Sequence, residues 1–412
     1  MPLVKPHRLA ASFVIAAASF LSPHSSFAQF PVVGPRGAAM GGASVGVADD
    51  GTALWTNPAG LARDPRIDVE LFGGAVATSR NDFLGAADAL SSVDLNRIRS
   101  GDFSQVPGAL RALNSLSHTG SGVVGSGTAG LVLGKSGFTL GIGEVAYAGV
   151  YPTIDLVHIL PVSPAIDPVH AFANNATGLS FAGLEAREVR LGYGTSFFGK
   201  VLLVGGAVRY IEGRTYFVRQ GIFDADLSDP IAVARRAFDQ NQQTTNKLAF
   251  DVGAMVNIAG VARVGVVSTA INEPEFAVRQ DPTGTDATLV GAPAMMRLPR
   301  TLRAGAAVQP IGVLLVAVDY DLRETDTLIP GGRSRQLSGG VEVKLPLFAL
   351  RAGTFRDSAA PDPHWAYSAG FGIGLKMLSI NAAVVFSTEG GTSLSSTNRR
   401  DLGGSVDARL RF

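Results

Sequence analysis

Apolar and polar residues alternate along most of this chain. The last eleven residues, LGGSVDARLRF, place apolar side chains on one face, ending in Phe412, and Asp407 and Arg409 on the other. The same period of two recurs in QLSGGVEVKL (336–345) and WAYSAGFGIGL (365–375). Because side chains of a β-strand point alternately to opposite faces, this period predicts strands with one apolar face.

Taken over the whole chain, the alternation predicts about fourteen strands. They lie near residues 67–77, 128–134, 137–148, 181–196, 199–212, 246–258, 260–270, 300–308, 311–323, 335–345, 347–356, 364–375, 376–387 and 402–412. The connections after odd-numbered strands are long, whereas those between are tight turns such as GKSG (134–137). Long loops at one end and short turns at the other are typical of outer-membrane barrels. We therefore predict an all-β, transmembrane, antiparallel barrel of about 14 strands.

A soluble β-sandwich is the alternative, because its strands alternate equally well. The predicted outward faces carry almost no charge, which favours the membrane barrel. The terminal Phe412 also resembles the C-terminal signal that bacterial outer-membrane barrels present to the barrel-assembly machinery. Closure is required, since every backbone N–H and C=O in lipid must be paired within the protein. An even number of strands places both termini at the short-turn end.

The first residues predict export. A basic start is followed by an apolar stretch at 9–21 and by small residues before Ala28, which indicates a secretory signal peptide over 1–28. The mean hydropathy is +0.24, yet no later run is long and apolar enough for a membrane helix. An export signal followed by a predicted transmembrane barrel places the protein in the cell outer membrane of a Gram-negative-type envelope. The absence of cysteine excludes disulfides, and a net charge of +1 gives no electrostatic case for nucleic acid.

A segment rich in glycine and alanine, GAAMGGASVGVADDGTALWTNPAGLA (37–62), follows the signal. It lacks the spacing and the preceding strand of a nucleotide-binding loop. Small side chains allow close backbone approach, so we interpret residues 29–66 as a plug inside a barrel formed by 67–412. Asn57 is expected to cap a short helical turn that begins at Pro58. The plug motif residues are Gly41, Gly42, Asp49, Asp50, Asn57, Pro58 and Gly60.

Charged residues of both signs occupy the predicted inward faces. Those singled out are Arg209, Asp251, Arg303, Asp319, Arg351, Asp407 and Arg409. An ion-pair network around the plug explains mixed signs better than an ion-selective pore does. Arginines on these faces are expected to pair with Asp49 and Asp50. The six histidines form no metal-binding pair or HExxH motif, so no metal, cofactor or enzyme activity is predicted.

The third strand, GFTLGIGEVAYAGVY (137–151), changes its alternation near Gly143 and Glu144. Either the strand ends near Glu144, or a bulge lies inside the wall.

The segment 35–62 closely resembles the N-terminal signature of FadL-like outer-membrane proteins. It is nearest the PorV-like and TraF-like (conjugal transfer) branch, which shares R-G-A-x-M-G-G-A, A-D-D and N-P-A-G-L. The resemblance implies a fourteen-stranded barrel with an N-terminal hatch, used for uptake of hydrophobic molecules. It also implies a kinked third strand that opens toward lipid near Gly141 and Gly143, with Glu144 lining the gap and the ladder around Gly141 to Val145 locally unpaired. Large insertions at 78–127, 150–180 and 213–245 depart from the family pattern, and their structure is left open.

Two functions follow as hypotheses. The first, which the sequence favours, is passage of hydrophobic small molecules across the outer membrane. The second is a plugged barrel that anchors or shuttles partners for an envelope, secretion or conjugal-transfer system. An apolar pocket between plug and wall would favour the first, and a lumen packed with ion pairs the second. The expected partners are outer-membrane lipid together with either a hydrophobic ligand or envelope proteins.

Overall fold

The computed structural model describes residues 33–63, 67–91, 106–155, 177–221, 239–281, 286–387 and 400–412, together with residues 97 and 104. The predicted signal peptide, 1–28, and the first residues of the predicted plug lie outside these ranges.

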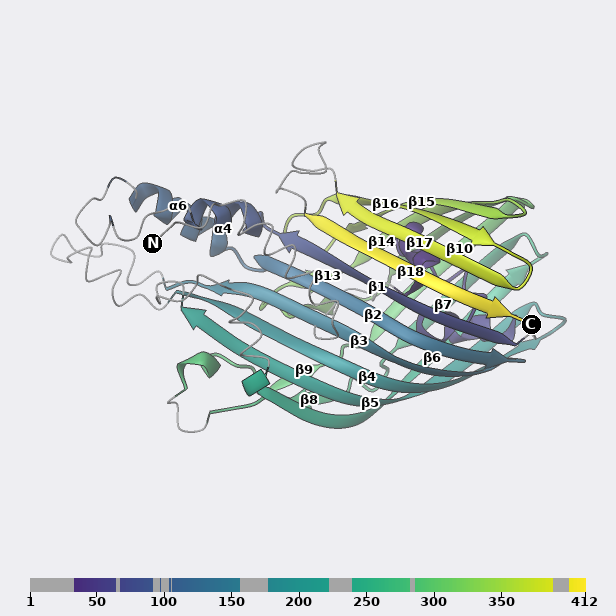
Figure 1. The fold of residues 1–412 in the computed structure, drawn as a ribbon, viewed down its shortest axis with the longest axis horizontal. Coiled ribbons are helices and arrows are strands. Elements are labelled where there is room, and N and C mark those ends of the chain that lie inside the picture. The colour runs from purple at the N-terminus through teal and green to yellow at the C-terminus, as the bar shows by residue number, and fades with distance from the viewer. Residues whose placement is uncertain are drawn as a thin grey trace.

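The chain forms a closed antiparallel barrel of fourteen strands (Figure 1). The strands are β1 (Asp68–Arg80), β2 (Gly122–Lys135), β3 (Phe138–Thr153), β4 (Gly178–Phe197), β5 (Leu202–Gly221), β6 (Gln242–Ile258), β7 (Ala262–Thr269), β10 (Thr301–Ile311), β11 (Leu314–Asp321), β14 (Gln336–Lys344), β15 (Phe348–Asp357), β16 (Trp365–Gly374), β17 (Leu378–Ser387) and β18 (Asp401–Arg411). Each strand pairs with its neighbours in sequence, and β18 closes on β1. The predicted fold class is confirmed.

Both ends of the wall lie at the end of the barrel that carries the short turns, which we call the turn end. There the Phe412 amide donates to the Ile67 carbonyl at 3.0 Å. The opposite, loop end carries the long connections, including α4 (Phe83–Ser91) and α6 (Val106–Leu116).

The alternation did not predict the short elements of the loops. These are the hairpin β8 (Glu275–Ala277) and β9 (Met295–Arg297), the helical turn η3 (Ala287–Leu289), and the pair β12 (Thr325–Asp326) and β13 (Arg333–Ser334). Within the described part of the chain, no helix has the length and apolar character needed to cross a membrane.

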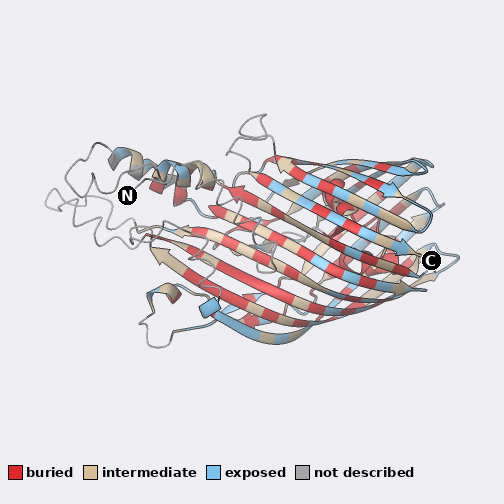
Figure 2. Cartoon of the chain, in the orientation of Figure 1, coloured by how far each residue is buried: buried red, intermediate tan, exposed pale blue. Residues whose placement is uncertain are grey.

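Large apolar side chains cover the outside of the wall. Four examples are Leu71, Ile142, Leu191 and Val406, whose exposed fractions are 57–61%. Exposed and buried residues alternate along the strands (Figure 2). The inward neighbours are buried against the lumen contents. An outward apolar band with an inward polar face is the arrangement that lipid on one side and packed protein on the other requires.

The wall is much taller on one side than on the other. β4 and β5 have 20 residues each, whereas β14 to β17 have 9 or 10. With a rise of about 3.3 Å per residue and a tilt of about 40°, ten residues span about 25 Å, the height of an apolar band. The short strands therefore just cross such a band, and β4 and β5, with twice as many residues, extend about 25 Å beyond it. This extension lies toward the loop end (Figure 1).

This extension corrects the predicted insertions at 78–127, 150–180 and 213–245. The first residues of each predicted insertion belong to a strand, because β1 reaches Arg80, β3 reaches Thr153 and β5 reaches Gly221. The extended segments are rich in glycine and small polar residues, since wall above the apolar band does not need an apolar outward face. The alternation that predicts strands is therefore weak there.

Candidate functional site

The lumen is occupied by residues 33–63, which we call the hatch. It contains α2 (Gly34–Ala39), α3 (Ala53–Thr56) and the 3-10 turn η1 (Pro58–Ala62). Its glycines are needed for close approach to the wall. Gly41 has φ of +68°, and a Cβ there would collide with the backbone of Thr354 on β15. At Gly60 a Cβ would collide with the carbonyl of Ala48 within the hatch.

Asn57 organises the end of the hatch. Its side-chain oxygen accepts a hydrogen bond from the Ala59 amide at 3.2 Å, and Pro58 occupies the first position of η1, as the sequence predicts. Its amide nitrogen donates to the Val45 carbonyl at 3.2 Å, so one fully buried side chain joins two hatch segments. The wall accommodates this turn with glycine, because a Cβ at Gly253 of β6 would collide with Asn57.

Buried hydrogen bonds fasten the hatch to two strands of the wall, β16 and β11. On β16, the Ser368 hydroxyl accepts from the Gly41 amide at 3.0 Å and donates to the Ala39 carbonyl at 2.9 Å. On β11, Asp319 accepts from the amides of Ser44 and Val45 at 2.7 and 2.9 Å. The role found for Asp319 is therefore to hold hatch backbone.

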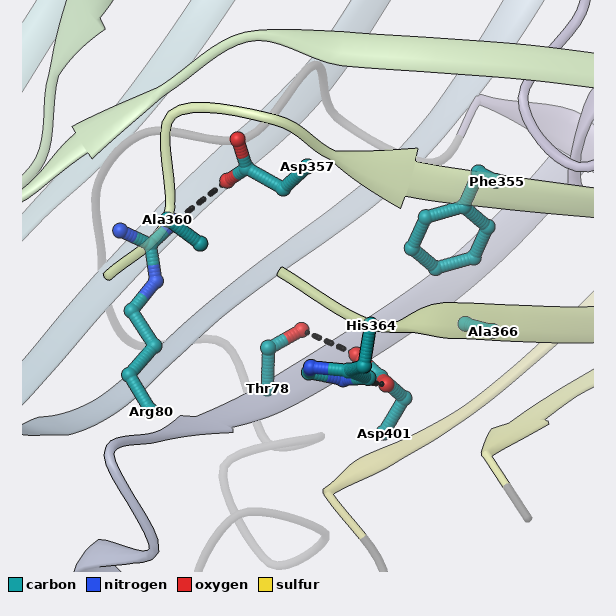
Figure 3. Close-up of a pocket in the computed structure, with 8 residues that line it drawn as sticks. All are labelled: Thr78, Arg80, Phe355, Asp357, Ala360, His364, Ala366 and Asp401. Carbon is teal, nitrogen blue, oxygen red and sulfur yellow. Dashed lines mark hydrogen bonds and ion pairs between the residues drawn. The ribbon is translucent and has the colours of Figure 1, made fainter. Parts of the chain in front are cut away.

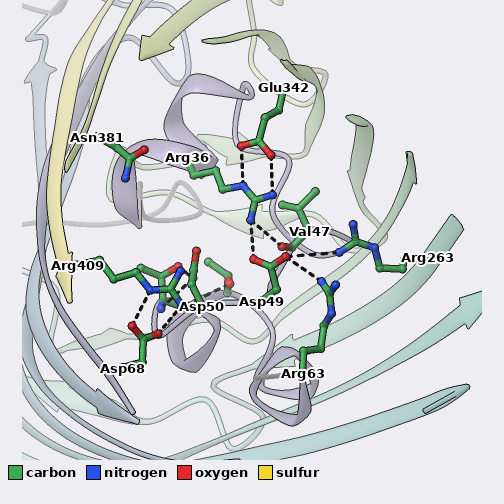
Figure 4. A network of polar contacts seen from close by, with 12 residues as sticks. Arg36, Val47, Asp49, Asp50, Arg63, Asp68, Arg263, Glu342, Asn381 and Arg409 are labelled. Atoms are coloured by element: carbon green, nitrogen blue, oxygen red, sulfur yellow. Dashed lines mark hydrogen bonds and ion pairs between the residues drawn. The ribbon is translucent and has the colours of Figure 1, made fainter. Parts of the chain in front are cut away.

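Ion pairs centred on Asp49 link the hatch to β14 and β15. Arg36 donates to Asp49 at 2.6 Å and, in a two-pronged contact, to Glu342 at 3.0 and 2.8 Å. Arg351 donates to the same Glu342 at 2.7 Å. Arg63 donates to Asp49 at 3.0 Å, on the side away from Arg36 (Figure 4). Two of the partners of Asp49 thus come from the hatch itself rather than from the wall.

The same contacts set the ionisation of the hatch residues. Burial alone would raise the pKa of Asp49, but the positive charges of Arg36, Arg63 and Arg263 outweigh it and hold the pKa well below its usual range. For Arg36, burial opposes the charged form, yet Asp49 and Glu342 raise its pKa above the ordinary value. Both groups therefore remain charged, and the pairs persist over the physiological pH range.

A second ion cluster lies beside α3, on β4 to β6. Arg209 donates to Glu188 and to Asp251, each at 3.1 Å, and Arg190 donates to Glu188 at 2.6 Å. The Arg190 guanidinium also lies 4.7 Å from the ring centre of Trp55 in the hatch. This cluster fills the lumen beside the hatch with charges of both signs that neutralise one another.

The remaining predicted lumen charges are paired as well. Arg409 of β18 donates to both oxygens of Asp68 on β1, and Asp407 accepts from Asn381 at 2.7 Å. Arg303 of β10 donates to Asp321 at 2.6 Å. Asp50 accepts from the Thr52 amide at 3.1 Å rather than from an arginine. The structure thus places the predicted lumen charges in ion-pair and hydrogen-bond clusters around the hatch.

The third strand is continuous, and both expectations for it are wrong. β3 pairs without a register shift, and Gly143 lies opposite Gly130 of β2 and Glu188 of β4. Gly141 and Gly143 face Trp55 of the hatch, where a Cβ would crowd the indole. Glu144 points outward, on the face that also carries Ile142, and lies 3.8 Å from Arg187 of β4. No opening toward lipid exists at this strand in the structure.

In β3 the large apolar side chains change from the outward to the inward face because the environment of the strand changes along its length. Below Glu144 the large apolar side chains of β3 face outward, whereas above it Val145, Tyr147 and Tyr151 face inward and are buried. These residues join an apolar core at the loop end of the lumen. Sequence analysis missed this core, whose members include Leu184, Phe217, Phe276, Leu289, Met296 and Ile329.

Loop segments cover this apolar core from inside the barrel. The hairpin β8–β9 packs Phe276 against Gly213 of β5, where a Cβ would collide with the ring. The Thr215 hydroxyl donates to the Ala277 carbonyl at 2.5 Å. The inward face of the tall wall is therefore covered by the protein's own side chains.

A small cavity lined by polar and apolar side chains lies at the loop end, between residues of β1, β15, β16 and β18 (Figure 3). There His364 contacts Asp401 at 2.6 Å, the Thr78 hydroxyl donates to Asp401 at 2.8 Å, and Arg80 donates to Asp357 at 2.7 Å. The hydrogen bond to Asp401 raises the pKa of His364 to about 9, although burial opposes it. The cations Arg80 and His364 face the carboxylates Asp357 and Asp401, so the cluster stabilises the barrel seam, where β1 pairs with β18. Across the described ranges, no group of three or more histidine or acidic side chains is placed to hold a metal ion.

Comparison with known proteins assigns the family. A family model described as "F plasmid transfer operon, TraF, protein" matches residues 54–321, more than half of the chain. The chain belongs to this TraF family. No curated protein matches it.

Solved structures share the fold at low sequence identity. The CymD monoaromatic hydrocarbon channel is 13% identical, with a TM-score of 0.52 over 94% of this chain and 99% of that channel. A TodX deltaS2S3 mutant monoaromatic hydrocarbon channel is also 13% identical, with a TM-score of 0.50 over 92% and 97%. This TraF-family chain therefore has the barrel fold of FadL-like channels, and the suspected resemblance is confirmed.

Proposed function

We propose that this TraF-family protein is an outer-membrane barrel with a closed lumen that serves as an anchoring component of an envelope assembly. The observation that carries the proposal is the way in which the hatch is held. Ser368 and Asp319 bind its backbone from different strands, and Glu342 pairs with Arg36. A hatch fixed by buried contacts on several strands is costly to displace, because each broken contact leaves an unpaired buried group.

The continuous wall supports the same conclusion. An apolar solute that entered the lumen from the loop end would meet the hatch below it and a complete strand ladder beside it. Because the described residues place the hatch and the wall across these two routes, the surfaces left for function are those that face outward at the two ends. The transfer operon in the family description makes a conjugal or related envelope assembly the natural setting.

Cross-linking with mass spectrometry in intact cells tests the proposal. We expect reproducible links between the barrel and a periplasmic or outer-membrane protein other than the barrel-assembly machinery. A variant with Arg297→Gln at the exposed loop end is a matched surface control. Links to lipid and to the assembly machinery alone would refute anchoring.

Passage of hydrophobic molecules is a second candidate, and the apolar core at the loop end favours it. Tyr147, Phe217 and Phe276 form the kind of lining that an apolar solute could enter if β8–β9 moved away. The similar solved structures are described as hydrocarbon channels. Native mass spectrometry of the purified barrel separates the candidates, because a bound apolar small molecule supports passage and its absence supports anchoring.

A further inference from the structure

Three arginine side chains converge on one carboxylate at the turn end of the lumen. Arg36 and Arg63 come from the hatch, and Arg263 is the second residue of β7. Their Nη1 atoms lie 2.6, 3.0 and 3.8 Å from the nearest oxygen of Asp49 (Figure 4). We call Arg63, Arg263 and the Asp49 oxygen between them the cradle.

More guanidinium groups than carboxylates make direct contacts at the cradle. Arg36 is occupied by two bonds to Glu342 in addition to its bond to Asp49, and Glu342 is shared with Arg351. In direct contact, four guanidinium groups share two carboxylates, Asp49 and Glu342, and the negative charge of Asp50 also acts on Arg36. A single oxygen of Asp49 serves both Arg63 and Arg263.

Arg263 lacks a hydrogen-bond acceptor. Its side chain is 8% exposed, and its Nη1 atom has no hydrogen-bond partner among the residues that the structure describes. The 3.8 Å separation from Asp49 exceeds hydrogen-bond range. A buried charged donor without an acceptor is unfavourable, so an additional acceptor at this position would be stabilising.

The cradle is open on the side of the short turns. The side chains of Arg63 and Asp49 are 29% and 28% exposed. Arg63 precedes β1, and Arg263 follows the turn after β6, so both lie where the lumen meets the turn end. In the orientation of outer-membrane barrels, this end faces the periplasm.

We propose that the cradle binds a carboxylate that a periplasmic partner protein presents on an acidic segment. This inference rests on the proposed anchoring function and specifies its contact point. The planar guanidinium fork matches a carboxylate geometrically, and two forks can bridge one such group. A lipid phosphate is a poorer occupant, because the cradle lies inside the lumen and the wall separates it from the bilayer.

Peptide binding to the purified barrel in mild detergent tests the cradle. The probe is a fluorescent, acetylated hexaglutamate peptide followed by anisotropy, and hexaglutamine is the uncharged control. We expect Arg263→Gln and Arg63→Gln each to weaken hexaglutamate binding by about tenfold or more, since each removes one fork. The matched control, Arg297→Gln at the opposite end, should leave the dissociation constant unchanged.

Several results would refute the proposal that the cradle binds a partner's carboxylate. Equal binding of the two peptides, or equal binding by wild type and Arg263→Gln, would do so. Complete displacement of hexaglutamate by equimolar inorganic phosphate would reduce the cradle to a general anion site. If Arg263→Gln fails to fold, as judged by heat-modified gel mobility, Arg63→Gln decides, because it lies outside the wall. Cross-links to a partner that persist in a folded Arg63→Gln variant would refute the cradle and leave anchoring intact.

Discussion

The destabilisation caused by an arginine on the outward face of β14 should depend on the depth of the substituted residue in the membrane. The structure places Val343 on the outward face, one residue before the strand ends at Lys344. Val341 is also outward, is 39% exposed, and lies at the centre of the strand between Val316 and Ala352. Val341 is therefore the residue nearest the bilayer midplane on this strand.

The expected magnitudes follow from that spacing. Two residues correspond to about 5 Å of depth at the strand tilt. Arginine costs about 2–4 kcal/mol at the midplane and about 0–1 kcal/mol near an interface. Val341→Arg should therefore lower the free energy of unfolding by about 3 kcal/mol, and Val343→Arg by about 1 kcal/mol.

Reversible folding into lipid vesicles, followed by tryptophan fluorescence across a denaturant titration, measures both values. Val341→Leu is the matched control and should change stability by well under 1 kcal/mol, because it keeps an apolar side chain against lipid. Equal losses for the two arginine variants, or a larger loss at Val343, would refute the assigned depth. A Glu342→Arg variant does not serve as a mild lumen control, since Glu342 holds both Arg36 and Arg351.

Three further predictions concern the hatch and the seam. Asp319→Ala should destabilise the hatch by about 2–4 kcal/mol, because two buried amides lose a charged acceptor; unchanged amide exchange at Ser44 and Val45 would contradict this. Asn57→Ala should cost about 1–2 kcal/mol in unfolding free energy through loss of the cap, and Asn57→Asp should keep the cap but lose the hydrogen bond to the Val45 carbonyl. Because the pKa of His364 is raised from 6.5 to about 9, its ion pair contributes fully below pH 6.5 and is lost as pH rises through 9. The unfolding midpoint should fall over that range in wild type, and an identical fall in His364→Gln would refute it.

Strand existence could be predicted from the sequence where one face meets lipid and the other meets protein. The alternation in β14 to β18 is regular for that reason, and their predicted bounds agree with the structure to within about three residues. It was misleading in β3, where the environment changes along one strand. Glu144 lies at that change, so apolar residues move from the outward to the inward face without any bulge.

The contents of the lumen were only partly predictable. Inward charges could be assigned from strand parity, and Asn57 from the cap that precedes Pro58. Their partners could not, because pairing depends on which residues of the hatch reach which strand. The roles of Arg36 and Arg63 therefore appear only in three dimensions, as does the apolar core under β8–β9.

Conductance across a planar bilayer tests the closed lumen most directly. We predict that the purified wild-type barrel gives no steady ionic current above the bare bilayer, because the hatch fills the lumen and its ion pairs fix it there. A variant that lacks residues 33–63 keeps every strand of the wall and should conduct. A stable current through the wild-type barrel, comparable to that of the hatchless variant, would contradict the account.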